Sequence, residues 1–346
     1  MSDILIRKDG KAGRITLNRP DVLNALTWPM CSEIYRALGE WANDPDIALL
    51  VVDGAGDRAF SAGGDIAEMY ARGCAKDYDY MRRFWRDEYR MNARMFNFSK
   101  PVVTFLHGFT MGGGVGVGCH GSHRIVCETS RIAMPEVSIG LCPDVGGSLI
   151  LARAPGRIGE YLGVTASRMD TGDAIHAGFA DYFVPQAEWP ELIVSLCATG
   201  NWQAVDSAAL PPPTSALADS QPVIDRVFDG ERLEDCLTNL DHENGAFAED
   251  TRKALSRNAP LGMACAIEQI HRVRARDTIE AALDQEYRFT WRSGPQGDFF
   301  EGIRAAIIDK DRNPRWAHAH PSDVKAHEVS AMLQPLGPDK LAFQEY

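Results

Sequence analysis

The sequence lacks a long apolar run. No stretch approaches the roughly 18 uncharged apolar residues that a membrane-spanning helix needs, so we expect no membrane partner. The first residues form neither an apolar export segment nor an Arg- and Ser-rich leader, which predicts neither export nor import. Of the 346 residues, 45% are hydrophobic and 24% are charged, so we expect a globular chain with one large domain and a smaller appendage.

An excess of positive charge is also missing. Lys and Arg number 36 against 48 Asp and Glu, which gives a formal net charge of −12. Nucleic acids and anionic membranes bind cationic surfaces, so we expect neither as a partner. An anionic small molecule needs only a local pocket, and the charge balance does not exclude one.

The cysteines lack C-x-x-C spacing, and the motifs H-E-x-x-H and G-x-S-x-G are missing too. A zinc site and a nucleophile elbow are therefore not expected. The eight cysteines are Cys31, Cys74, Cys119, Cys127, Cys142, Cys197, Cys236 and Cys265. Scattered through mostly apolar stretches of a chain without an export signal, they predict reduced, buried thiols in a cytoplasmic protein.

The first 185 residues repeat a unit of short strands followed by a helix, with glycine at the strand-to-helix junctions. Strands are expected in a hairpin over residues 4–17 and at 47–52, 101–106, 124–126 and 131–133, and helices over 27–43 and 77–97. This alternation predicts a wound α/β layer structure.

The character of the chain changes after about residue 200. A proline-rich segment over 208–215 reads as a linker. Helices are expected beyond it near 221–228, 231–239, 246–256, 260–275, 277–292 and 298–309, and Asp277 with Glu280 resembles a capping box. The sequence therefore predicts an α/β core over residues 1–205 and a helical C-terminal region over 206–346.

Two glycine-rich turns follow predicted strands. They are Phe60-Ser61-Ala62-Gly63-Gly64-Asp65 and His107-Gly108-Phe109-Thr110-Met111-Gly112-Gly113-Gly114. Such turns expose backbone N–H groups at the start of a helix, and two that converge can form an oxyanion hole. The alternative is tight strand-to-helix packing without a ligand.

A dinucleotide-like fingerprint, G-x-G-x-x-G, begins at Gly116. A functional fingerprint follows a strand directly, whereas the strand here is expected to end near Gly108. Gly116 should already lie inside a helix, so the sequence does not favour a nicotinamide cofactor.

Two carboxylates occur in the apolar, Pro- and Gly-punctuated loop over residues 134–147, namely Glu136 and Asp144. A carboxylate in an apolar pocket can act as acid, base or nucleophile, and the neighbours of Glu136 favour this interpretation. Asp144 precedes a predicted helix, so it is either a second functional acid or a helix N-cap.

In their order along the chain, these segments resemble the enoyl-CoA hydratase/isomerase (crotonase) superfamily over about residues 4–190. The segments are Leu17-Asn18-Arg19-Pro20 with Leu23-Asn24-Ala25-Leu26, the Phe60–Asp65 turn, Gly112-Gly113-Gly114 and Pro135-Glu136. The chain is most similar to the 3-hydroxyisobutyryl-CoA hydrolases through Pro143-Asp144-Val145-Gly146-Gly147, Glu88-Tyr89 and the segments 301–305 and 309–316.

The resemblance implies a crotonase-like ββα superhelix core that carries the helical C-terminal region, and hydrolysis of 3-hydroxyisobutyryl-CoA in valine breakdown. Hydratases of this superfamily have two glutamates, whereas here Gly116 occupies the first position and Glu136 the second. An enoyl-CoA hydratase or isomerase and a non-catalytic acyl-CoA-binding protein are the alternatives. Cys142 stands where relatives often have an aromatic residue, which leaves the acyl group open.

By resemblance, the thioester oxygen would bind the backbone amides of Gly64 and Gly113. Glu136 would attack the carbonyl carbon or act as a base on water. Asp144 would orient the 3-hydroxyl group, and Glu88 would line the acyl end of the pocket.

The resemblance implies an acyl-CoA substrate without a metal or redox cofactor, and it leaves a homo-oligomer open. The candidate cations for the CoA phosphates are Arg19, Lys100, Arg304, Lys310 and Arg312.

Overall fold

The computed structural model describes residues 2–343, and these pack as two compact units whose segments alternate along the chain. The first unit holds the residues up to Gly64 together with Asp87–Ala133 and Arg168–Ala218. The second holds Asp65–Arg86, Met134–Ser167 and the residues from Asp219 onward. The division of the chain into domains at residue 205 stays a prediction.

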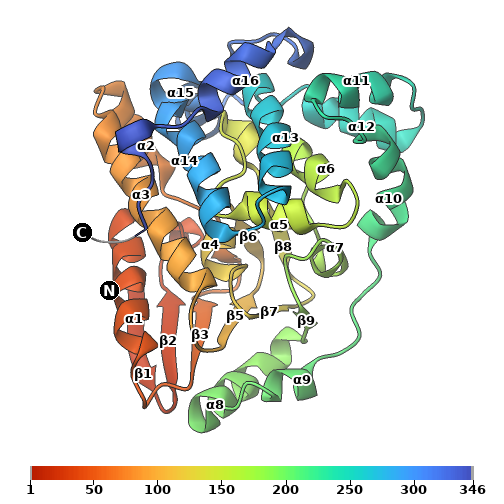
Figure 1. Ribbon diagram of the computed structural model, residues 1–346. Coiled ribbons are helices and arrows are strands. Elements are labelled where there is room, and N and C mark those ends of the chain that lie inside the picture. Colours follow the sequence, from red (N-terminus) through yellow and green to blue (C-terminus); the bar gives the residue numbers. More distant parts are fainter. Residues whose placement is uncertain (1, 344–346) are drawn as a thin grey trace. The chain divides into compact units, whose positions relative to one another are not determined.

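The first unit is built on a six-stranded sheet in the order β1-β2-β3-β5-β7-β9. The strands are β1 (Ile4–Asp9), β2 (Ala12–Leu17), β3 (Leu49–Gly54), β5 (Val102–Leu106), β7 (His123–Val126) and β9 (Tyr182–Phe183). The predicted hairpin is confirmed, because β1 and β2 pair antiparallel, and every later pair is parallel. Figure 1 shows β1, β2 and β3 side by side.

A second sheet of three short parallel strands lies in the same unit, in the order β4-β6-β8. They are β4 (Ala59–Ser61), β6 (Phe109–Met111) and β8 (Arg131–Ala133), and each follows a strand of the larger sheet. The predicted repeat of strand, strand and helix is thus confirmed. Because β4 and β6 are neighbours, the glycine turns that follow them leave the sheet side by side.

Helices cover the strands of the first unit. They are α1 (Trp28–Ala42), α4 (Gly113–Gly118), α7 (Thr171–His176), α8 (Trp189–Thr199) and α9 (Ala204–Ala208). As predicted, α1 begins after Thr27, whose hydroxyl accepts a hydrogen bond from the amide of Met30 at 3.4 Å. The apolar face of α8 is buried against β3 and β5, where Trp189 meets Phe105 edge-on with ring centroids 5.2 Å apart.

The second unit is almost entirely helical. Its helices are α2 (Ile66–Cys74), α5 (Gly147–Arg153), α6 (Ile158–Thr165), α10 (Ala216–Val227), α11 (Leu233–Asp241), α12 (Ala246–Leu255), α13 (Pro260–Arg274), α14 (Ile279–Gln296), α15 (Phe299–Ile303) and α16 (Ala326–Leu333). Two helices are shared between the units: α3 (Tyr78–Phe96) begins in this unit and ends in the first, and α10 begins in the first unit, whose last residue is Ala218. The six predicted C-terminal helices are confirmed, and α13 and α14 run alongside each other (Figure 1).

The predicted capping box at Asp277 and Glu280 is wrong by one residue. Thr278 is the N-cap of α14, and its hydroxyl accepts a hydrogen bond from the amide of Ala281 at 3.2 Å. A threonine hydroxyl next to the first helical residue reaches this amide, and Asp277 is left to pair with Arg153 at 2.6 Å.

Seven of the eight cysteines are buried free thiols, as predicted, whereas Cys74 at the end of α2 is exposed. Within residues 2–343, no helix is both long and apolar enough to cross a membrane.

Candidate active site

The loop over residues 19–26 holds the first glycine turn in place. From the sequence, this loop is recognised as part of the family resemblance, without a role in the site. Asn24 is fully buried, and its side-chain amide donates to the carbonyl of Ala59 at 2.8 Å and of Ala55 at 2.9 Å. Its own carbonyl accepts a bond from the hydroxyl of Ser61 at 2.9 Å. These bonds fix the chain just before Gly64 and make Asn24 a structural element of the site.

The second glycine turn brings the amide of Gly113 next to that of Gly64. A Cβ atom placed on Gly113 would lie 3.3 Å from the amide nitrogen of Gly64. By standard backbone dimensions, the two amide nitrogens therefore lie within about 6 Å of each other. Within residues 2–343, neither amide donates a backbone hydrogen bond: Gly113 is the first residue of α4, so its amide has no acceptor inside that helix, and Gly64 lies in the turn before α2. The pair is available to a ligand oxygen.

Glu88 on α3 lies beside this pair of amides. Its carboxylate is buried, with 3% of the residue exposed, and Oε1 would lie 2.8 Å from a Cβ atom on Gly113. Burial raises the pKa of the nearby Cys31 thiol, and the negative charge of Glu88 raises it further. The first unit thus brings together three predicted site residues: Gly64, Gly113 and Glu88.

The second unit contains the two predicted loop carboxylates. Glu136 is the first residue of the short 3-10 helix η2 (Glu136–Ile139) and is 4% exposed. Its carbonyl accepts a hydrogen bond from Leu141 at 3.0 Å, and Val137 accepts one from Ala259 at 2.8 Å. Side chains added at Gly302 or Gly262 would meet the carbonyls of this loop, so close packing by α13 and α15 fixes its backbone.

Asp144 is 5% exposed and begins a tight turn into α5. Its carbonyl accepts a hydrogen bond from Gly147 at 2.7 Å. Val145 (φ 55°) and Gly146 (φ 80°) are both left-handed. The N-cap of α5 is Gly146, with no capping side chain, so the interpretation of Asp144 as an N-cap is wrong.

Sequence reasoning missed Glu286, a buried carboxylate on α14. It accepts hydrogen bonds from the amide of Gly146 at 2.7 Å, from the amide of Ser148 at 3.1 Å and from the Ser148 hydroxyl. Burial raises the pKa of Glu286 to about 8, the bonds from Ser148 and Gly146 oppose that rise, and the charge of Asp144 adds to it.

A signal for Glu286 is present in the sequence. The buried residues of α14 include Ile279, Ala282, Leu283, Glu286, Phe289, Thr290 and Ser293, which recur at helical spacing. A carboxylate on such a face needs a partner, because an unpaired buried charge is costly.

Three of the five candidate cations already bind groups of the protein. Lys100 donates to the carbonyls of Trp41 and Asp44 at the end of α1, and Arg19 donates to the carbonyl of Ala25 at 2.7 Å. Arg304 is surrounded by carboxylates at 2.6 to 2.8 Å, namely those of Glu301, Asp309 and Asp311. Lys310 and Arg312 are exposed.

The glycine fingerprint at Gly116 lies inside α4, as predicted, and not at a strand end. This placement leaves no βα turn for a pyrophosphate.

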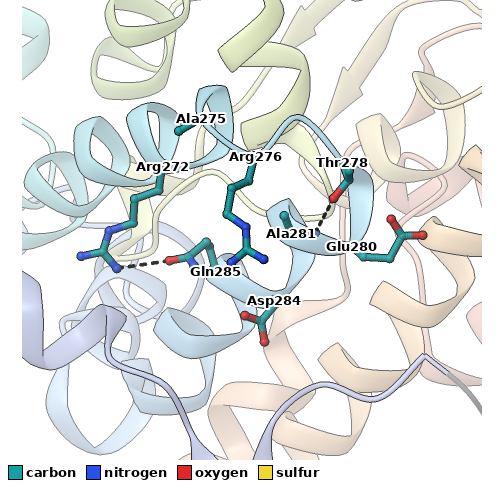
Figure 2. Close-up of a pocket in the computed structure, with 8 residues that line it drawn as sticks. All are labelled: Arg272, Ala275, Arg276, Thr278, Glu280, Ala281, Asp284 and Gln285. Atoms are coloured by element: carbon teal, nitrogen blue, oxygen red, sulfur yellow. Dashed lines mark hydrogen bonds between the residues drawn. The ribbon is translucent and has the colours of Figure 1, made fainter.

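A cavity of about 520 Å³ lies elsewhere in the second unit, at the junction between the end of α13 and the start of α14 (Figure 2). Its lining includes Arg272, Arg276, Glu280 and Asp284, and none of the predicted site residues. Because the lining has two positive and two negative side chains, it favours neither anionic nor cationic ligands.

Comparison with known proteins gives the family. The family model described as enoyl-CoA hydratase/isomerase matches residues 12–333. The chain is 35% identical to the 3-hydroxyisobutyryl-CoA hydrolase, mitochondrial, of Gallus gallus, covering 98% of this chain and 91% of that one. It is 34% identical to the protein of the same name from Homo sapiens, over 99% and 91%. The chain belongs to the enoyl-CoA hydratase/isomerase (crotonase) family.

Solved structures agree with this fold. An enoyl-CoA hydratase from Rhodobacter sphaeroides 2.4.1 is 53% identical, with a TM-score of 0.93 over 99% of this chain and 100% of the other. A carnitinyl-CoA dehydratase from Mycobacterium thermoresistibile is 36% identical, with a TM-score of 0.94 over 100% of both chains. The predicted crotonase-like α/β class with a helical C-terminal region is confirmed. The hydrolase relatives are named as mitochondrial, and a cytoplasmic location stays a prediction for this chain.

Proposed function

We propose that this crotonase-family enzyme hydrolyses the thioester of 3-hydroxyisobutyryl-CoA to 3-hydroxyisobutyrate and CoA. The observation that carries the proposal is the pair of adjacent amides at Gly64 and Gly113, neither of which donates a backbone hydrogen bond within residues 2–343. The names of the hydrolase relatives support the choice of substrate.

The chemistry starts with the thioester oxygen accepting hydrogen bonds from the amides of Gly64 and Gly113. Negative charge grows on this oxygen in the tetrahedral intermediate, and each donor lowers the barrier by roughly 3 kcal/mol. Glu136 either attacks the carbonyl carbon, giving a mixed anhydride that water then cleaves, or removes a proton from the attacking water. In both routes the C–S bond breaks, the thiolate of CoA takes up a proton, and one water is consumed.

Asp144 and Glu88 have supporting roles in the proposal. Asp144 orients the 3-hydroxyl group and assists proton transfer, and Glu88 lines the acyl end. No metal or redox cofactor is required, because the thioester carries the activation and the protein supplies placed charge.

An enoyl-CoA hydratase is the second candidate, favoured by the name of the relative from Rhodobacter sphaeroides. Adding water across a double bond needs a base and a proton donor, and Gly116 removes the first glutamate of the hydratase pattern. The buried carboxylate of Glu88 beside Gly113 is the group that could replace it. The hydrolase is preferred because Asp144 stands where hydratases of the superfamily usually have glycine.

The experiment tests two substrates in parallel, 3-hydroxyisobutyryl-CoA and an enoyl-CoA thioester. Thiol release from 3-hydroxyisobutyryl-CoA, followed with a thiol reagent, supports the hydrolase. Absorbance change at an enoyl thioester without thiol release supports the hydratase, and binding without either reaction would leave an acyl-CoA-binding protein.

Two variants refine the test. Glu136→Ala should abolish thiol release while CoA-ester binding persists, because the carboxylate acts on the carbonyl carbon. Asp144→Ala should reduce turnover of 3-hydroxyisobutyryl-CoA more than that of isobutyryl-CoA, and an equal loss on both would contradict its orienting role.

A further inference from the structure

The turn that carries Asp144 is bound to a distant helix through one side chain. Glu286 on α14 accepts bonds from the amides of Gly146 and Ser148, at 2.7 and 3.1 Å, and from the Ser148 hydroxyl. The two carboxylate oxygens therefore hold both ends of the Gly146–Ser148 segment. Since 138 residues separate Ser148 from Glu286, no local sequence rule creates this contact.

The backbone of this turn needs such a restraint. Val145 has a φ of 55°, in the left-handed region that a β-branched residue adopts only under strain. Gly146 follows with a φ of 80° and caps α5 without a side chain of its own. Glu286 takes over the role of that missing cap, because it binds the first free amides of the helix.

The charge of Asp144 also reaches Glu286. Both acids belong to the second unit, and the charge of Asp144 makes ionisation of Glu286 harder. Glu286 and Asp144 are thus linked through the backbone of the turn and through the charge of Asp144.

We propose that Glu286 is a positioning residue that fixes the Asp144 carboxylate through the Gly146–Ser148 segment and thereby sets the preference for 3-hydroxyacyl substrates. The substrate part rests on the proposed function of this chain, whereas the positioning part does not. A displacement of about 1 Å in such a group costs on the order of 100-fold in rate.

The experiment compares Glu286→Gln with Glu286→Asp and with the unchanged protein. In Glu286→Gln one oxygen becomes an NH2 group that faces an N–H donor, so one of the two amide bonds is lost while size is kept. We expect kcat on 3-hydroxyisobutyryl-CoA to fall about 10-fold or more, a smaller loss on isobutyryl-CoA, and KM changed less than about 2-fold. Glu286→Asp keeps both acceptor oxygens and should recover part of the substrate preference.

The matched control is Glu160→Gln, a second fully buried glutamate of the same unit that bonds no residue of the turn. It should lower the thermal midpoint and leave unchanged the ratio of kcat on 3-hydroxyisobutyryl-CoA to kcat on isobutyryl-CoA. If Glu286→Gln also leaves that ratio unchanged, the substrate part of the proposal is wrong.

Hydrogen exchange separates this proposal from the proposed function. The amides of Gly146 and Ser148 should exchange at least 10-fold faster in Glu286→Gln than in the unchanged protein, whichever reaction the enzyme performs. Unchanged exchange would overturn the positioning role. Faster exchange in an enzyme that releases no thiol from 3-hydroxyisobutyryl-CoA would overturn the proposed function and the substrate part, and leave the positioning role standing.

Discussion

Oxygen Oε1 of Glu88 lies 2.8 Å from the point where a Cβ atom on Gly113 would stand. This separation is shorter than any ordinary carbon–oxygen contact, so a side chain at position 113 would displace the carboxylate of Glu88. The backbone amide that binds substrate in the proposal is thus packed directly against a buried carboxylate.

Gly113→Ala should reduce turnover by about 100-fold or more, since the added methyl group would lie 3.3 Å from the amide nitrogen of Gly64, where the thioester oxygen binds in the proposal. Steady-state kinetics measure the loss. Removing the obstructing carboxylate in the double variant Gly113→Ala/Glu88→Ala should restore part of the thermal midpoint that Gly113→Ala loses. Gly178→Ala serves as the control: its φ of 79° makes a side chain strained although a Cβ atom meets nothing within 4 Å, so this variant should lower the thermal midpoint and leave turnover unaffected.

Replacement of Asn24 tests the loop that holds the first glycine turn. Asn24→Ala leaves the buried carbonyl of Ala59 and the half-buried carbonyl of Ala55 without their donor, which should lower the free energy of unfolding by about 3 kcal/mol. Urea unfolding measures the change. Asn24→Asp should be at least as damaging, because a carboxylate would face the two carbonyls. The exposed Asn201, changed to Ala, provides the comparison, and a loss below about 1 kcal/mol for Asn24→Ala would show that the bonds are dispensable.

A buried ion cluster predicts how stability responds to acid. Glu160 on α6 binds Arg274 of α13 at 2.7 Å, His271 at 3.0 Å and Arg157 at 2.9 Å. Burial alone would raise the pKa of Glu160, but the bonds from His271, Arg274 and Arg157 outweigh it and lower the pKa to about 2.

Because this folded-state pKa is lowered from 4.5, the stabilisation is present above about pH 4.5 and is lost as pH falls towards 2. It amounts to about 3 kcal/mol. Chemical unfolding at several pH values should show a smaller acid-dependent loss in Glu160→Gln than in the unchanged protein. Parallel curves for the two proteins would contradict the prediction.

The raised pKa of Glu286 predicts that the free energy of unfolding falls as the pH increases. Burial raises its pKa from 4.5 to about 8, so its contribution to stability is fully present below pH 4.5 and is lost as pH rises through 8. Glu286→Gln, which cannot ionise, should flatten the decline in unfolding free energy between about pH 5 and 9. Thermal unfolding across this range measures the slope, and an unchanged slope would mean that Glu286 does not take up a proton on folding.

Several parts of the molecule follow from local sequence. Thr27 marks the start of α1 because its hydroxyl caps the nearest free amide, and the hairpin over residues 4–17 follows from two apolar runs around a turn. The two glycine turns were also predictable, since glycine at a strand end signals a close backbone approach. These features depend on residues within a few positions of each other.

The sequence by itself determined the strand, strand and helix repeat, the glycine turns and the residue types of the predicted acids, because each is written in short-range periodicity and turn chemistry. Only the tertiary structure decided that Glu88 faces Gly113, that Lys100 and Arg304 are already bound within the protein, and that Glu286 holds the turn after Asp144. The physical reason is that a buried polar group must find a partner wherever the packed chain provides one, and the distance along the sequence does not limit that choice.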